Sequence, residues 1–232
     1  MKTLTKYLNE KLIIFPSQVD EKLVINKDYN DPHTCAPTSW DELRKIIEDR
    51  YDKLGPGTND KPINFNDVDV SGINSFCNSK GKGIFAETKF KYIDISKWDV
   101  SNVKNMNNAF WNCKNLTSVG DLSNWDVSNI KNMSRMFSLC MQLKSVGDLS
   151  NWNVSNAKDM GAMFGNCEQL VSIGDLTDWN VSNVENMNSM FEYCKKLKSI
   201  GELSKWDVSN VNDMSYMFDN SGITNIPDWY KK

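Results

Sequence analysis

One unit of 27 residues is written five times in this chain, and it constrains the fold more than any other feature. A tryptophan opens each copy, at Trp98, Trp125, Trp152, Trp179 and Trp206. The first two copies read WDVSNVKNMNNAFWNCKNLTSVGDLSN and WDVSNIKNMSRMFSLCMQLKSVGDLSN, and no gap is needed until the last copy. A unit this short cannot close a core of its own, so the copies are expected to stack on one another as coils of a repeat solenoid.

The apolar positions inside one copy predict its local structure. One set recurs at the spacing i, i+3, i+4, i+7, as Met106, Ala109, Phe110 and Cys113. That spacing predicts one face of a short helix, for which Asn105 would be the N-cap. Leu116 and Val119 predict a short strand, and Trp98 and Val100 a second extended stretch. Each 27-residue coil is therefore predicted to combine short parallel strands, about 4.8 Å from those of the next coil, with a short helical turn.

A helix is predicted ahead of the repeats. Ser39 followed by Glu42 makes a capping box, and the glycines around Pro56 stop the helix after Leu54. Leu43 and the isoleucines after it supply an apolar stripe. We expect this helix to cap the N-terminal edge of the solenoid.

Three parts are expected along the chain. Residues 1–37 form an N-terminal extension, a candidate targeting or docking segment with a weak amphipathic helix over residues 4–12 and extended segments near 12–15 and 22–25. Residues 38–63 hold the capping helix and a linker, and residues 64–232 the solenoid. Within the solenoid we expect a degenerate coil 64–97, the repeats 98–124, 125–151, 152–178 and 179–205, and a C-terminal cap 206–232.

Four of the six cysteines recur at the repeat interval, as Cys113, Cys140, Cys167 and Cys194. One cysteine per copy makes a column and not a metal knuckle of closely spaced pairs. We expect reduced, buried thiols that act as small apolar side chains. Stacked disulfides or a metal ladder remain the alternative.

The composition argues against catalysis and against nucleic-acid binding. The chain has one histidine, His33, and a net charge of −3. It carries no Ser-His-Asp or Cys-His arrangement and no phosphate-binding loop. A column of acidic residues could suggest calcium, at Asp121, Asp148, Asp175 and Glu202. One carboxylate per coil after a glycine is more often a turn residue, so we expect no metal, no cofactor and no enzyme.

The sequence predicts no membrane span, because it lacks a run of 18 apolar residues. Its first residues are too polar for the apolar core of a signal peptide. As written, the chain is expected to be cytoplasmic or virion-associated, or to lie at the cell surface if a signal has been removed.

The residues that vary among copies at positions predicted to be exposed are the candidates for binding a partner. They are Trp111, Arg135, Leu139, Lys144, Tyr193, Lys198 and Tyr216. Aromatic side chains and arginine are enriched in protein interfaces. The alternative is that the variation marks only solvated positions.

The repeated Asp-Val-Ser-Asn-Val-x-Asn-Met-x-x-Met-Phe-x-x-Cys-x-x-Leu pattern resembles the BspA-type leucine-rich-repeat surface proteins of bacteria. It is similar in particular to their Trp-Asp-Val-Ser-Asn variant, known from mycoplasma lipoprotein-associated repeats. The similarity covers residues 38–232. It implies a leucine-rich-repeat-like solenoid and a role in adhesion or protein recognition.

A looser similarity concerns the first residues, whose short amphipathic pattern resembles the start of some tailed-phage proteins. The sequence therefore leaves two alternative functions. The first is a non-enzymatic module that binds a protein or a glycan. The second is a structural, decorating or internal component of a bacteriophage particle, with virion proteins as partners.

Overall fold

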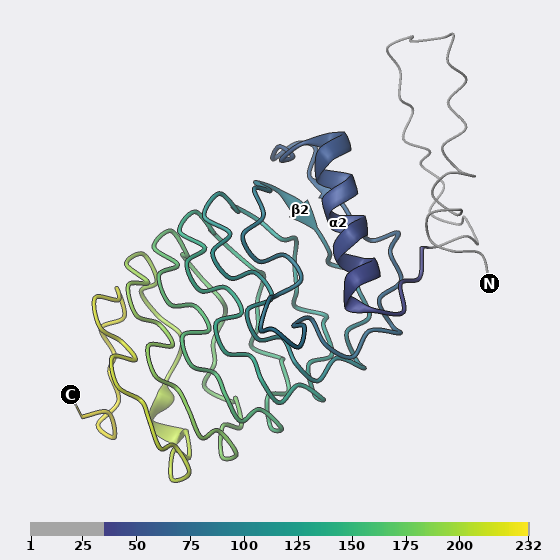
Figure 1. Ribbon diagram of the computed structural model, residues 1–232. Coiled ribbons are helices and arrows are strands. Elements are labelled where there is room, and N and C mark those ends of the chain that lie inside the picture. Colours follow the sequence, from purple (N-terminus) through teal and green to yellow (C-terminus); the bar gives the residue numbers. More distant parts are fainter. Residues whose placement is uncertain (1–34, 232) are drawn as a thin grey trace, which may run out of the picture.

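The computed structural model describes residues 35–231 and contains few regular elements. Helix α2 spans Trp40–Leu54, strands β1 and β2 span Ile63–Asn64 and Ile93–Asp94, and the 3₁₀ helix η1 spans Leu203–Lys205. β1 and β2 pair in parallel. The rest of the described chain winds into successive coils that lie side by side from α2 to the C-terminal end (Figure 1). The helix and extended segments expected within residues 4–25 lie outside the described residues.

Two series of parallel bridges join each coil to the next. One runs through Ser75, Asn105, Asn132, Asp159, Asn186 and Asp213, and the other through Tyr92, Ser118, Ser145 and Ser172. Within the repeats, bridged residues are one sequence period apart, so the period of the sequence is also the period of the coils. The predicted parallel pairing is present, but the strand predicted around Leu116 and Val119 is reduced to the single bridge residue Ser118.

The prediction of a short helix in each copy is wrong. In the first repeat the N–H of Ala109 donates to the carbonyl of Met106 at 3.0 Å, and a second turn of the same kind follows over residues 110–113. The third residues of these turns, Asn108 and Asn112, have positive φ angles of 58° and 61°. Two consecutive β-turns of the type II kind therefore replace the helix.

Hydrogen bonds to the neighbouring coil explain why these residues form tandem turns instead of a helix. In each of the four repeats between residues 98 and 205, four backbone N–H groups donate to carbonyls of the next coil at 2.7–3.1 Å; in the first repeat they are those of Met106, Asn108, Phe110 and Asn112. A helix would use the same groups internally. The apolar spacing cannot separate the two structures, because the corner residues of tandem turns also point inward. All four predicted apolar positions of the first repeat are indeed fully buried.

The predicted N-cap residues have a different role from the one expected. Asn105 is a bridge residue, and its Oδ1 accepts the N–H of Asn107 at 2.9 Å. Its equivalents Asn132 and Asp159 do the same for the residues two positions later. These Asx turns start the tandem turns and not a helix.

Columns of identical side chains fill the interior. The rings of Phe110 and Phe137 stack with centroids 5.0 Å apart, and those of Phe137 and Phe164 with centroids 5.7 Å apart. The indole Nε1 of Trp152 donates to the carbonyl of Leu122, 30 residues earlier in the chain, at 2.9 Å, and later copies repeat this bond. Each coil thus buries its apolar side chains mainly against its two neighbours.

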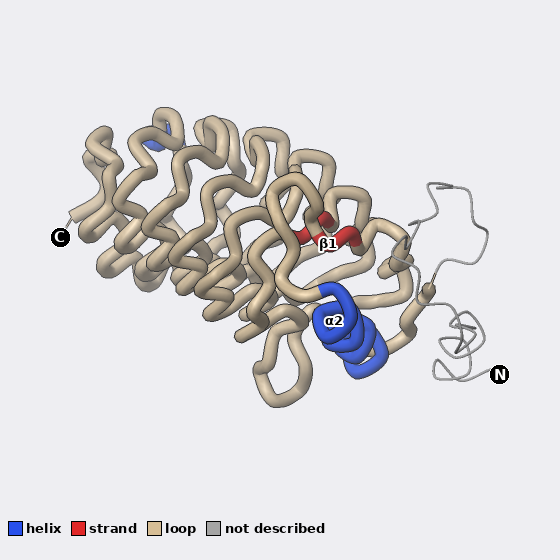
Figure 2. Tube along the Cα trace, turned by 90° about the horizontal axis from the view of Figure 1, so that it is seen from above, coloured by secondary structure: helices blue, strands red, loops and turns tan. Residues whose placement is uncertain are grey.

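Helix α2 forms as predicted and covers the end of the stack nearest the N-terminus (Figures 1 and 2). The Ser39 side chain accepts the N–H of Glu42, and Gly55 ends the helix with a positive φ of 73°. Arg44, nearly buried, donates from Nη1 to the carbonyls of Ile84 and Ala86 at 2.8 and 3.2 Å. The helix therefore supplies donors for carbonyls that would otherwise lie unpaired at the end of the stack.

A glycine with a positive φ angle follows each Ser118-type bridge at the turn of the coil, and its replacement is predicted to lower stability. Gly147 has a φ of +93°, and a Cβ there would collide with Oδ1 of Asp121 in the preceding coil. We expect Gly147→Ala to lower the free energy of unfolding by about 2–3 kcal/mol, because conformational strain adds to the collision. Urea denaturation would measure the loss. Gly81→Ala is the matched control, since Gly81 also has a positive φ but has open space around it. Equal losses in the two variants would contradict the role of the collision.

Candidate partner-binding surface

Ten residues with left-handed backbone conformations form two columns on the tandem turns, residues 106–113 and their equivalents in later coils. We call this surface the tandem-turn edge. The first column holds Asn108, Arg135, Ala162, Ser189 and Tyr216, with φ between 51° and 58°. The second holds Asn112, Leu139, Asn166, Tyr193 and Asn220, with φ between 54° and 63°. Only glycine and, to a lesser degree, asparagine or aspartate adopt this conformation at low cost.

Four of the seven predicted partner-binding residues stand in these columns. Tyr216 is 61% exposed and Tyr193 is 37% exposed, and Arg135 is exposed as well. Leu139 and Trp111 are half-buried, so the prediction that these two are exposed is wrong. The repeat pattern alone does not reveal this partial burial.

The two predicted lysines lie outside the tandem turns, beside the Ser118-type bridges. Lys144 is exposed and bonds through its backbone to the exposed Val171 of the next coil. Lys198 reaches the carbonyl of Lys195 with its Nζ at 3.4 Å. The structure therefore does not gather all seven predicted residues into one cluster.

Sequence reasoning missed Lys195, which connects Lys198 to the tandem-turn edge. Its Nζ lies 5.7 Å from the centroid of the Tyr193 ring and 3.1 Å from Oε2 of Glu168. The signal was its position two residues after an exposed tyrosine. The exposed Tyr193 ring therefore has one ammonium group beside it, that of Lys195, whose charge is paired with Glu168.

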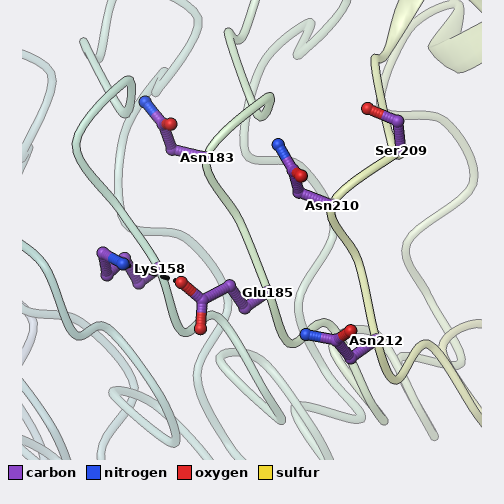
Figure 3. A pocket seen from close by; sticks show the side chains of 6 residues that line it. All are labelled: Lys158, Asn183, Glu185, Ser209, Asn210 and Asn212. Atoms are coloured by element: carbon purple, nitrogen blue, oxygen red, sulfur yellow. Dashed lines mark hydrogen bonds and ion pairs between the residues drawn. The ribbon is translucent and has the colours of Figure 1, made fainter.

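A shallow polar cavity of about 390 Å³ crosses the last three copies (Figure 3). It is lined by Lys158, Asn183, Glu185, Ser209, Asn210 and Asn212. Lys158 and Glu185 face each other across neighbouring coils, with Nζ 2.7 Å from Oε1. The sequence signal for this cavity was a column that changes from lysine to glutamate to asparagine, and sequence reasoning did not use it.

The acidic column is engaged in turns. The carboxylates of Asp121, Asp148 and Asp175 each accept the N–H of the residue two positions later at 2.9–3.0 Å. The hydroxyl and N–H of Thr177 lower the pKa of Asp175 below its usual range. Among the described residues there is no group of three or more histidine, cysteine or acidic side chains arranged to hold a metal ion.

The repeat cysteines are free thiols, as predicted, and all four are buried. The Sγ atoms of Cys140, Cys167 and Cys194 donate to phenylalanine carbonyls of the preceding coil at 3.1 Å. Burial raises the pKa of each of these three thiols, that of Cys194 to about 12. Such thiols stay protonated and unreactive at neutral pH.

The helices that the structure describes are all too short or too polar to cross a membrane.

The repeats identify the family. A sequence profile described as "Mycoplasma protein of unknown function, DUF285" matches residues 79–199 and 171–229. The chain belongs to the DUF285 family. The DUF285 match covers all the repeats and leaves α2 outside it.

A solved structure, of a leucine rich cell surface protein from Faecalibacterium prausnitzii A2-165, is similar over 62% of this chain at 18% identity. The DUF285 chain spans 35% of that protein, and the TM-score of 0.29 is too low to define a fold. No curated protein matches the chain. None of these comparisons supports the phage-particle alternative.

Proposed function

We propose that this DUF285 protein is a non-enzymatic binding module of the BspA type. Its stacked coils would form a leucine-rich-repeat-like solenoid of the Trp-Asp-Val-Ser-Asn variant, and its tandem-turn edge would bind a protein partner at a cell surface. The membership of a family with mycoplasma representatives and the repeated coils with parallel bridges support this proposal.

The observation that carries the proposal is the presence of bulky side chains where the backbone favours glycine or asparagine. Arg135, Leu139, Tyr193 and Tyr216 all have φ between 53° and 63°. A left-handed conformation costs such residues about 1–2 kcal/mol each. Asparagine stands at other copies of the same columns, so the relaxed alternative is available to this sequence. Strain of this kind concentrates at functional sites, where the side chain itself is needed.

Replacing the two exposed tyrosines tests the proposal. We expect the double variant Tyr193→Asn, Tyr216→Asn to be at least as stable as the parent, with a gain of about 1 kcal/mol per site from relieved strain. The same variant is expected to weaken partner binding at least tenfold, because aromatic anchors dominate interface energies. Urea denaturation measures the first effect.

Quantitative affinity capture from extracts measures the second effect. Lys114→Asn serves as the control, because Lys114 is exposed and lies outside the left-handed columns. A protein retained by the parent and the control but lost by the double variant would support the assignment. Capture that is identical for all three chains, or a double variant that is less stable than the parent, would contradict it.

A further inference from the structure

Positive charge gathers on the segments that connect the tandem turns to the Ser118-type bridges. These segments are residues 88–92, 114–118, 141–145, 168–172 and 195–199, and we call their surface the lysine band. Seven exposed lysines stand on it against one acidic residue, Glu168. The lysines are Lys89, Lys91, Lys114, Lys144, Lys195, Lys196 and Lys198. Because the whole chain has a net charge of −3, this concentration of one charge is local and does not follow from the composition.

Backbone hydrogen bonds hold the band in register. The N–H of Thr117 donates to the carbonyl of Lys91 at 2.7 Å, and that of Lys144 donates to the carbonyl of Thr117 at 3.1 Å. The N–H of Val171 continues the series to the carbonyl of Lys144, and Lys198 follows one repeat later. Lysines therefore stand on alternate coils in this column, about 10 Å apart, because parallel strands are spaced by about 4.8 Å.

Most of these charges have no carboxylate beside them in the described part of the chain. Lys195 pairs with Glu168, and none of the other six band lysines forms an ion pair with a residue of 35–231. Lys91 instead lies with its Nζ 5.7 Å from the centroid of the Tyr92 ring. Unpaired charges of one sign on one face raise the local concentration of anionic molecules and speed their association.

An acidic row beside the band limits the width of what can bind there. In each coil it follows the band by a few residues, as Asp94, Asp121, Asp148, Asp175 and Glu202. Hydrogen bonds from Thr177 lower the pKa of Asp175, and those from Ser204 and Asn225 lower the pKa of Glu202. These carboxylates are therefore ionised at neutral pH. A flat anionic membrane or a duplex nucleic acid would meet this row as well, whereas a single anionic chain can lie on the band alone.

The side chains of the band suit carboxylates better than a nucleic acid. The band has no arginine, the residue that binds phosphate with a fork of two donors. Of its two aromatic rings, Phe90 is buried and Tyr92 is half-buried, so it offers no fully exposed platform for stacked bases. Val171, which is 58% exposed, adds an apolar contact between the lysines. Residues 1–34 hold five lysines and five acidic residues, so they bring no net negative charge to the band.

We propose that the lysine band binds an extended acidic segment of a partner protein, laid along the axis of the stack. Three residues of a polyproline II segment advance about 9.3 Å, close to the interval between lysines on alternate coils. An acidic residue at every third position therefore meets Lys91, Lys144 and Lys198 in turn, and a residue between them contacts Val171. This site is separate from the tandem-turn edge and goes beyond the function proposed for that edge.

A labelled peptide of four Pro-Pro-Glu units is the probe, added to the full chain and followed by fluorescence anisotropy. We expect saturable binding that weakens at least tenfold when the salt concentration rises from about 0.05 M to about 0.5 M, because salt screens exposed charges. A peptide of four Pro-Pro-Gln units should not bind. A peptide with the same composition as the probe but with its glutamates contiguous should bind at least threefold more weakly. No binding of the probe, or equal binding of the two acidic peptides, would overturn the proposal.

Two charge-reversal variants locate the binding. Lys144→Glu with Lys198→Glu is expected to weaken binding of the probe at least tenfold. Lys104→Glu with Lys131→Glu makes the same change of charge at exposed lysines outside the band and should leave the affinity within twofold. Thermal unfolding followed by circular dichroism checks that both variants fold. Equal losses of affinity would show that the peptide responds only to net charge and would refute the band as a site.

Other occupants of the band are distinguished by the same assay and by light scattering. Tighter binding of an oligothymidylate, a polyuronate or phosphatidylserine vesicles than of the acidic peptide would overturn the proposal. A dimer that dissociates in the Lys144→Glu, Lys198→Glu variant would place a second copy on the band instead. The Tyr193→Asn, Tyr216→Asn variant keeps all the band lysines and is expected to bind the probe normally, so failure of one proposal is distinguishable from failure of the other.

Discussion

The free energy of unfolding is expected to fall steeply above about pH 8.5. Burial raises the pKa of Cys140, Cys167 and Cys194, the last to about 12. In the unfolded chain the pKa of a cysteine thiol is about 8.5. Between these values the unfolded chain releases protons that the folded chain retains, so rising pH favours unfolding. Each buried thiol contributes about 1.4 kcal/mol per pH unit, and the three together about 4 kcal/mol per pH unit.

Urea denaturation followed by tryptophan fluorescence, in the presence of a reductant, would measure this slope between neutral pH and about pH 10. Cys167→Ala is the informative control. Its stability near neutral pH is expected to drop by about 1 kcal/mol, while its slope becomes shallower by about 1.4 kcal/mol per pH unit. An unchanged slope in this variant would show that other groups set the alkaline limit.

Phe137→Ala is expected to lower the free energy of unfolding by about 3–5 kcal/mol. The Phe137 ring is fully buried and is stacked on both faces, against Phe110 at 5.0 Å and Phe164 at 5.7 Å. Its removal leaves a cavity between two coils. Because each coil contacts mainly its neighbours, we also expect the two halves of the stack to unfold in separate steps.

Phe218→Ala is the matched control at the end of the stack. Phe218 is stacked on one face only, against Phe191 at 5.9 Å, and its other side meets Tyr230 edge-on. We expect a smaller loss of about 2 kcal/mol and a single transition. Guanidinium denaturation and calorimetry would distinguish the two variants. A larger loss at Phe218 than at Phe137 would contradict stabilisation by stacking on both sides.

The burial pattern and the cap could be predicted because both follow from local chemistry. An apolar side chain that returns every 27 residues must lie inside if the copies stack, and the Phe and Cys columns are buried. The start of α2 follows from the oxygen of Ser39 and its end from the left-handed Gly55. These signals depend on neighbouring residues and need no knowledge of the rest of the fold.

The tandem turns and the site could not be predicted in the same way. The spacing of Met106 and Phe110 suits a helix and a pair of turns equally well, and the choice depends on carbonyls in the next coil. The backbone strain at Tyr193 and Tyr216 follows from those turns, so it could not be predicted from the sequence either. Trp111 and Leu139 were assigned to the surface because variable positions are usually exposed, yet both are half-buried in the structure.

By itself the sequence determined the period of the stack, the residues that face its interior and the helix that closes its first end. Only the tertiary structure decided how the backbone turns inside each coil and which side chains are held in strained conformations. The reason is physical. Side-chain burial follows from composition and spacing along one chain segment, whereas backbone hydrogen bonds are satisfied by whichever partner the fold brings nearby, and here that partner is the next coil.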